Sequence, residues 1–233
     1  AVLPLDMKAA ASTVKRENTR VAKLIGINKA ARTTCVKPAG TTSLVLGTSS
    51  GIHAWHNDYY IRRLRVGKNE SIYKYLKQNH PGLVKDEYFR PHDTAVIEIP
   101  QSAPKGSILR TESAFDLLKR VKRVAEEWVK SGHRAGSNTH NVSATISLKE
   151  KDWAKAGEWM WKNRSCYNGL SVLPYDGGTY TQAPFEDITK KEFDKLVSKL
   201  QLINLENVVE EVDNTDLSGE LACTGGSCEI TSL

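Results

Sequence analysis

The stretch that decides the fold is residues 34–43, which read Thr34-Cys35-Val36-Lys37-Pro38-Ala39-Gly40-Thr41-Thr42-Ser43. It begins with β-branched residues typical of a strand, breaks at a proline and a glycine, and resumes with hydroxyl residues of the kind that begin helices. A strand that passes through a tight turn into a helix is a building block of α/β proteins. The stretch therefore predicts an α/β fold with a shaped turn at its centre.

The turn itself has the chemistry of an anion-binding loop. A helix N-terminus leaves backbone N–H groups without partners, its dipole favours negative charge, and a glycine lets an anion approach the backbone. The candidate phosphate-binding residues are Pro38, Ala39, Gly40, Thr41, Thr42 and Ser43. Ordinary helix capping after a turn explains the same residues, so both interpretations stay open. The pattern is not a Walker motif, because no Lys-Ser/Thr follows a spaced pair of glycines.

Outward from this stretch, short strands alternate with amphipathic helices. The periodicity predicts helices within residues 1–30, 111–130, 150–163 and 189–200. It predicts strands at 32–36, 61–66, 94–99, 141–148 and 169–173, with Pro100 ending the third. Thr189 and Glu192 have the spacing of a capping box at the start of the last helix.

Length, composition and charge bound the possible classes of protein. The 233 residues are 39% hydrophobic and 26% charged, enough for an ordinary core, and no apolar run approaches the ~20 residues of a membrane helix. Residues 205–233 contain seven acidic side chains and no Lys or Arg. Residues 1–204 therefore hold 33 basic and 20 acidic side chains, a net charge of +13. We expect a basic body over 1–204 that meets an anionic partner, and an acidic, mobile tail over 205–233.

Four cysteines are too few for a secreted disulfide scaffold and indicate a reducing cytoplasm. Cys35 stands alone in a predicted strand and Cys166 alone between a predicted helix and a predicted strand, and both are expected to be buried rather than reactive. Cys223 and Cys228 are separated by four small residues near the chain end, a spacing suited to thiol–disulfide exchange. Half a zinc site or two idle thiols are the alternatives. Zinc needs two more ligands, none lies nearby in sequence, and the six histidines have no ligand spacing, so no metal site is predicted.

Two further segments carry weaker signals. Residues 49–53, Ser-Ser-Gly-Ile-His, are small and polar and suit a pocket wall. Arg62 and Arg63 lie in a predicted strand, where they either meet anions or form a solvated face.

Taken together, these segments resemble the C-terminal part of the class II, adenosylcobalamin-dependent ribonucleoside-triphosphate reductases. The resemblance is carried in order by residues 34–43, 49–53, 60–63, 141–145, 167–178 and 180–185, and by the terminal Cys-x4-Cys. It covers nearly the whole chain from about residue 20, and several ordered motifs are more specific than any one of them.

The resemblance implies a fold, a reaction and partners. The fold would be the C-terminal portion of a ten-stranded α/β barrel with a flexible C-terminal tail, and the Pro38–Ser43 loop would hold the phosphates of a ribonucleoside triphosphate. Cys223 and Cys228 would carry electrons to an active-site disulfide, and thioredoxin or a similar dithiol protein would reduce them again. Adenosylcobalamin would generate a cysteine thiyl radical that begins removal of the ribose 2′ hydroxyl.

The resemblance also implies that parts of the enzyme lie elsewhere. The family's radical cysteine sits in an Asn-x-Cys-x-Glu pattern, which this sequence lacks. We therefore expect a fragment that needs an N-terminal part for turnover, and neither Cys35 nor Cys166 is assigned the radical role. No membrane and no direct nucleic-acid binding are expected. The rival readings are a basic nucleic-acid-binding module, which leaves the cysteine pair unexplained, and a standalone dithiol carrier, for which Thr41 and Thr42 would not matter.

Overall fold

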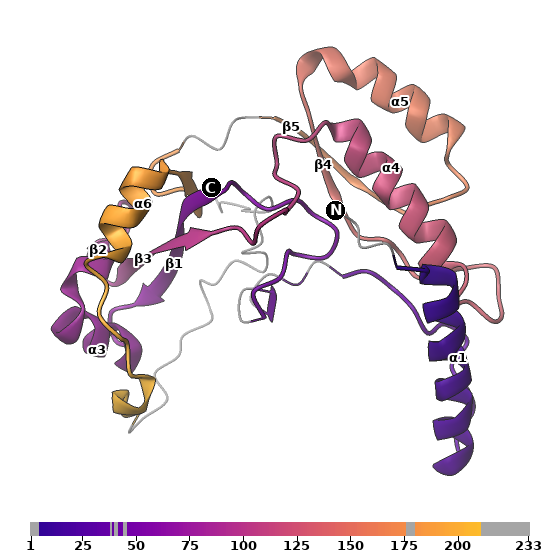
Figure 1. Cartoon of the computed structure of the whole chain (residues 1–233), viewed down its shortest axis with the longest axis horizontal. Coiled ribbons are helices and arrows are strands. Elements are labelled where there is room, and N and C mark those ends of the chain that lie inside the picture. Colours follow the sequence, from indigo (N-terminus) through magenta and orange to yellow (C-terminus); the bar gives the residue numbers. More distant parts are fainter. Residues whose placement is uncertain (1–4, 38, 40–41, 44–45, 176–179, 211–233) are drawn as a thin grey trace. The chain divides into compact units, whose positions relative to one another are not determined.

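A computed structural model describes residues 5–37, 39, 42–43, 46–175 and 180–210. The chain divides into two compact units, one made of Ala1–Trp55 with Gly106–Tyr175 and the other of His56–Lys105 with Asp176–Leu233 (Figure 1). Helices and strands occur in both, which confirms a mixed α/β composition. The strands of the described residues form one four-stranded and one two-stranded sheet. The boundary expected between residues 204 and 205 stays a prediction.

In its described residues, the first unit combines a parallel pair of strands with helices. Its helices are α1 (Met7–Leu24), α4 (Ala114–Val124) and α5 (Trp153–Lys162), and its two-stranded parallel sheet pairs β4 (Thr145–Leu148) with β5 (Ser171–Pro174). A π-helical turn, η2 (Ala125–Val129), continues α4, and a 3₁₀ turn, η3 (Glu150–Asp152), precedes α5. No helix in the described part of the chain is both long and apolar enough to cross a bilayer.

Helix α4 forms the centre of this unit's core. The Ser113 hydroxyl accepts the Asp116 N–H at 3.2 Å and caps the helix, and Leu118 and Val121 are fully buried at helical spacing. They pack with Ile146 of β4 and with residues of η2, and α1 lies against η2 as well. The helices predicted within 1–30, 111–130 and 150–163 are thus confirmed with shorter bounds.

The second unit is an antiparallel sheet in the order β2-β3-β1-β6. Its strands are β1 (Tyr59–Gly67), β2 (Val84–Asp86), β3 (Thr94–Ser102) and β6 (Phe185–Asp187). Its helical segments are α3 (Ser71–Asn79), η1 (Pro81–Leu83), α6 (Lys190–Val197) and η4 (Leu205–Asn207). The apolar core joins Leu76 of α3 to Val66, Val84, Ala95 and Ile97 of the sheet. The capping box is confirmed, because Thr189 and Glu192 bond each other's backbone N–H groups at the start of α6.

Two strand predictions need correction. Strand β3 does not end at Pro100 but runs through it to Ser102. Strand β2 pairs only with residues 95–97, so Pro100 lies where β3 has a partner on one side, a position that tolerates a missing N–H. Residues 32–36 form no continuous strand either. They make isolated bridges at Arg32 and Val36, because their neighbour along 133–142 is itself mostly irregular.

Candidate functional site

The predicted phosphate loop follows directly on a parallel bridge. Val36 pairs in parallel with Val142: its N–H donates to the Asn141 carbonyl at 3.3 Å, and its carbonyl accepts the Ser143 N–H at 3.1 Å. The bridge places the start of the loop at the carboxyl end of an extended segment, beside the residues that lead into β4. Ligands of α/β proteins gather at such ends.

Only part of the loop can be placed. Ala39, Thr42 and Ser43 are described, whereas Pro38, Gly40 and Thr41 lie outside the described residues. The Ser43 N–H donates to the Ala39 carbonyl at 3.2 Å, the i to i+4 bond of a first helical turn. Thr42 is exposed and Ser43 is buried. Of these two hydroxyl residues, Thr42 is therefore the one accessible from solvent.

The segment after this turn is fastened at two points. His53 Nδ1 lies 2.8 Å from the Ser50 carbonyl oxygen, and His53 Nε2 lies 3.0 Å from the Thr145 backbone nitrogen. Arg120 of α4 donates to the Ile52 carbonyl at 2.9 Å and is itself paired with Glu112. The 49–53 segment, predicted as a pocket wall, is thus held against both β4 and α4.

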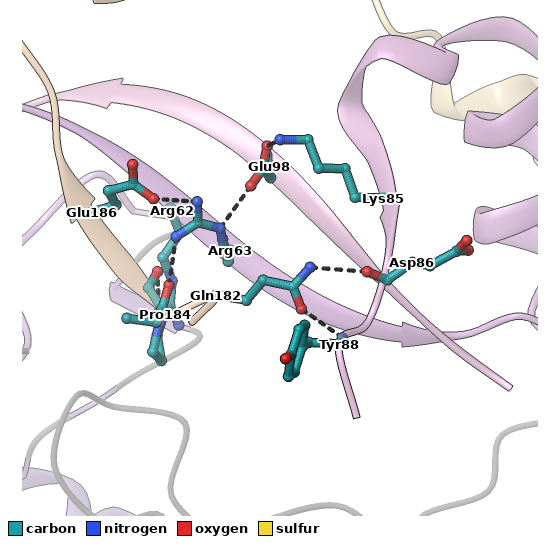
Figure 2. A network of polar contacts seen from close by, with 10 residues as sticks. Arg62, Arg63, Lys85, Asp86, Tyr88, Glu98, Gln182, Pro184 and Glu186 are labelled. Atoms are coloured by element: carbon teal, nitrogen blue, oxygen red, sulfur yellow. Dashed lines mark hydrogen bonds and ion pairs between the residues drawn. The ribbon is translucent and has the colours of Figure 1, made fainter. Parts of the chain in front are cut away.

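The two strand arginines are neither solvated nor open to an anion. Arg63 is 8% exposed, and its side chain donates to Glu98 and to Glu186 (Figure 2). It also donates to the Ala183 carbonyl. Burial lowers the pKa of Arg63, but the bonds to Glu186 and Glu98 outweigh it and raise the pKa above its ordinary value. Arg62 lies 4.3 Å above the Phe185 ring and bonds the Pro184 carbonyl. Both arginines therefore stabilise the second unit.

The 180–185 motif explains why these arginines are enclosed. Gln182 donates to the Asp86 carbonyl at 2.9 Å and accepts the Tyr88 N–H at 2.8 Å, so it reaches the end of β2 (Figure 2). The Pro184 carbonyl accepts the backbone N–H of Arg63 in β1 at 2.8 Å, and the next residue begins β6. The motif thus links the strands at the two edges of the sheet, β2 and β6.

The four cysteines fall into different environments. Cys166 is buried as expected, and burial, reinforced by Glu126, raises the pKa of its thiol. Cys35 is exposed, against expectation. The reason is the alternation of an extended backbone: Thr34 points inward, with its hydroxyl donating to the Trp128 carbonyl at 2.9 Å, and the next residue points outward. Cys223 and Cys228 lie outside the described residues.

Sequence reasoning missed the links that position the loop. The small, polar residues 49–53 predicted only a pocket wall, and nothing in the sequence pointed to Thr145 as the partner of His53. Nothing in the sequence indicated the ion pair between Arg120 and Glu112, which are eight residues apart. Nor did it indicate the hydrogen bond from Arg120 to the Ile52 carbonyl, because these residues lie 68 positions apart. Within the described ranges, no group of three or more His, Cys, Asp or Glu is placed to hold a metal ion.

Comparison with known proteins extends this picture. No protein-family model matches the chain. The adenosylcobalamin-dependent ribonucleoside-triphosphate reductase of Lactobacillus leichmannii is 27% identical over 213 residues, which are 89% of this chain and 28% of the relative. The enzyme of the same name from Euglena gracilis is 28% identical over 188 residues, 78% of this chain and 24% of the relative.

A solved structure shows the same fold. The crystal structure of a B-12 dependent (class II) ribonucleotide reductase superposes with a TM-score of 0.67 at 23% identity, covering 86% of this chain and 28% of that chain. The chain thus spans about a quarter of the length of the relatives it matches. The resemblance carried by the sequence motifs is confirmed: over most of its length, this chain is similar to a segment of the adenosylcobalamin-dependent ribonucleoside-triphosphate reductases.

Proposed function

We propose that this chain is the C-terminal part of a ribonucleotide reductase that converts ribonucleoside triphosphates to 2′-deoxyribonucleoside triphosphates. The observation that carries the proposal is the similarity to such enzymes over 89% of the chain, together with the place of the 38–43 loop after the parallel bridge at Val36. In this proposal the chain contributes its strands to a ten-stranded barrel completed by the remainder of the enzyme.

The 38–43 loop binds the substrate phosphates in this proposal. The Ser43 N–H bonds the Ala39 carbonyl with the spacing of a first helical turn, and first turns present backbone N–H groups that lack intrahelical partners. The exposed Thr42 adds a hydroxyl donor, and Lys37, exposed at the start of the loop, adds positive charge. Together they suit a triphosphate better than an uncharged ligand.

The tail cysteines carry the reducing equivalents. A thiolate of the Cys223–Cys228 pair attacks one sulfur of a disulfide in the barrel, and the other tail thiol resolves the mixed disulfide. This leaves two thiols in the barrel and one disulfide in the tail, so two electrons move inward. Thioredoxin or a similar dithiol protein then reduces the tail disulfide.

Adenosylcobalamin is the proposed cofactor and supplies the radical that starts the chemistry. We assign no residue of this chain to the cofactor. The chain's own part is to bind the phosphates, to orient the substrate and to deliver electrons.

The test combines this chain with the remainder of the reductase, adenosylcobalamin, a ribonucleoside triphosphate and a dithiol protein. Deoxynucleotide should form, Thr42→Val should raise KM, and Cys223→Ser with Cys228→Ser should stop repeated turnover. The matched control is Thr13→Val at an exposed position of α1, which should change neither KM nor turnover. No product beside an active relative assayed in parallel overturns the proposal. Unchanged KM in Thr42→Val, with the cysteines essential, favours a dithiol carrier instead.

A further inference from the structure

Helix α5 has an inner face that packs on the core and an outer face that carries exposed tryptophans. On the inner face, Ala156 is 2% exposed, and Trp159 packs against the core cluster that contains Leu118 of α4. On the outer face, Trp153 is 43% exposed and Trp161 is 71% exposed. Large aromatic side chains gathered on one exposed face mark interaction sites on proteins. The outer face of α5 therefore has the composition of a docking surface.

A glycine lies midway between these two tryptophans. Trp153, Gly157 and Trp161 are spaced by four residues, so they follow one another along the same side of the helix. A glycine inside a helix lowers the stability of the helix, and Gly157 is not among the glycines whose backbone is left-handed. A Cβ built on Gly157 would meet no atom of the described residues within 4 Å, so packing within the chain does not require the glycine either. The glycine instead leaves a notch between two indoles, where a second helix can approach closely.

Charged residues near the two ends of α5 extend this symmetric pattern. Glu150 lies seven residues before Gly157 and Arg164 lies seven residues after it, and both are exposed. Seven residues are close to two helical turns, so both lie near the same side as the glycine. The Arg164 guanidinium lies 4.6 Å from the centre of the Trp161 ring and donates to the Trp161 carbonyl at 2.9 Å, which holds it beside the outer face. The face is thus alike in its tryptophans on both sides of Gly157 and opposite in charge at its two ends.

Such a face is complementary to itself when two helices run antiparallel. A two-fold axis through Gly157 places each residue before the glycine opposite the residue equally far after it on the other copy. Trp153 of each copy then meets Trp161 of the other, and Glu150 meets Arg164. A parallel pair would instead set each charge against its own like charge, which is unfavourable. The charges therefore favour the antiparallel arrangement.

We propose that the outer face of α5 is a self-association surface, on which a second copy of the chain packs antiparallel with Gly157 at the crossing point. The inference goes beyond the proposed function and does not depend on it. Tryptophan and arginine are the residues that most often dominate the binding free energy of an interface. Because the contact is confined to one helix face, the dimer should be weak and reversible, with a Kd on the order of 10 µM.

The experiment is sedimentation equilibrium of the 233-residue chain, with a reductant present to exclude disulfide-linked dimers. The wild type should show a monomer–dimer equilibrium. Trp161→Ala should raise the Kd of the dimer at least about thirtyfold, because each interface loses two indoles. Gly157→Leu should raise the Kd at least about tenfold, because a side chain fills the notch. Phe89→Ala is the matched control: Phe89 is 74% exposed but belongs to the other unit, so its truncation should leave the Kd unchanged.

Exchange of the two charges tests the antiparallel arrangement. Glu150→Arg and Arg164→Glu each set like charges against each other at both ends of the interface, so each should raise the Kd about tenfold. The double variant restores opposite charges at both ends, and its Kd should be within about threefold of the wild type. Lys8→Glu changes the charge by as much as Arg164→Glu, at an exposed position of α1, and should have no effect. Far-ultraviolet circular dichroism checks that each variant is folded.

Three results would overturn the proposal. If the wild type remains monomeric at about 200 µM, self-association is wrong. Binding of the remainder of the reductase that Trp161→Ala weakens would then assign the face to a contact within the enzyme. If the chain dimerises and Trp161→Ala leaves the Kd unchanged, the dimer uses another surface. If the double charge variant binds as weakly as the single variants, the antiparallel arrangement is wrong.

Discussion

Arg63 and Glu98 face each other across β1 and β3, with Arg63 Nε 2.7 Å from Glu98 Oε1 and both side chains largely buried. Lys85 reaches the second oxygen of Glu98 at 2.6 Å, and Glu186 pairs with the far side of the guanidinium. The pair therefore joins the two central strands of the second unit through a small charged network.

Removing the arginine should destabilise this unit strongly. Arg63→Met leaves Glu98 and the Ala183 carbonyl without their shared donor, and loss of one partner of a buried pair costs about 3 kcal/mol. Glu186→Gln, at a carboxylate that is 51% exposed, should cost less than about 1 kcal/mol. Urea unfolding followed by circular dichroism measures both. Equal losses in the two variants would contradict the expectation that the buried Glu98 contributes more to stability than the half-exposed Glu186.

The same network predicts how stability depends on acid. Burial raises the pKa of Glu98, but hydrogen bonds from Lys85 and Arg63 outweigh it and hold the pKa below the ordinary 4.5. The folded chain thus binds this proton more weakly than the unfolded chain. The stabilisation is present above pH 4.5 and is lost as the pH falls through the lower, folded value.

Glu98→Gln removes that titration. Its free energy of unfolding should be lower than wild type at neutral pH, and it should fall less steeply as the pH is lowered below 4.5. Urea midpoints at several pH values give the two slopes. Parallel slopes for wild type and variant would show that Glu98 is not a source of the acid sensitivity.

Gly132, in the turn after η2, lies against the side chain of Thr34 in the 32–36 segment. A Cβ on Gly132 would lie 1.9 Å from Thr34 Oγ1, so Gly132→Ala should lower the free energy of unfolding by about 2 kcal/mol. Gly157→Ala is the control: it lies in α5 with open space around it and should raise stability by up to about 1 kcal/mol.

Tryptophan fluorescence reports these changes, because all five tryptophans belong to the first unit. Thr34→Ala should make Gly132→Ala less costly than it is alone, since the two sites are in contact. Strict additivity of the two substitutions would argue against a direct clash.

The two single cysteines should differ in reactivity. In a Cys223→Ser, Cys228→Ser background, Ellman's reagent should modify Cys35 rapidly, because it is exposed. Cys166 should react slowly, because burial and Glu126 raise the pKa of its thiol and the side chain is shielded. Both should react equally in urea. Cys35→Ser should abolish the rapid phase, and persistence of that phase would contradict the exposure of Cys35.

The elements that depend on local chemistry were predictable from the sequence. The capping box at Thr189 and Glu192 begins α6 as expected, and the apolar spacing around Leu118 and Val121 predicted α4. Hydroxyl caps and apolar periodicity act over three or four residues, so they can be read directly from neighbouring positions. The ordered motifs likewise pointed to the reductase family before any geometry was known.

What only the tertiary structure decided are the contacts between distant residues. The sequence did not show that His53 meets Thr145, 92 residues later, or that Arg63 is enclosed by Glu98 and Glu186. Such pairs depend on strand register and on where loops return, and these are settled by the packing of the whole unit rather than by any local preference. Local chemistry therefore predicted the caps and the helices, and packing determined which distant residues meet.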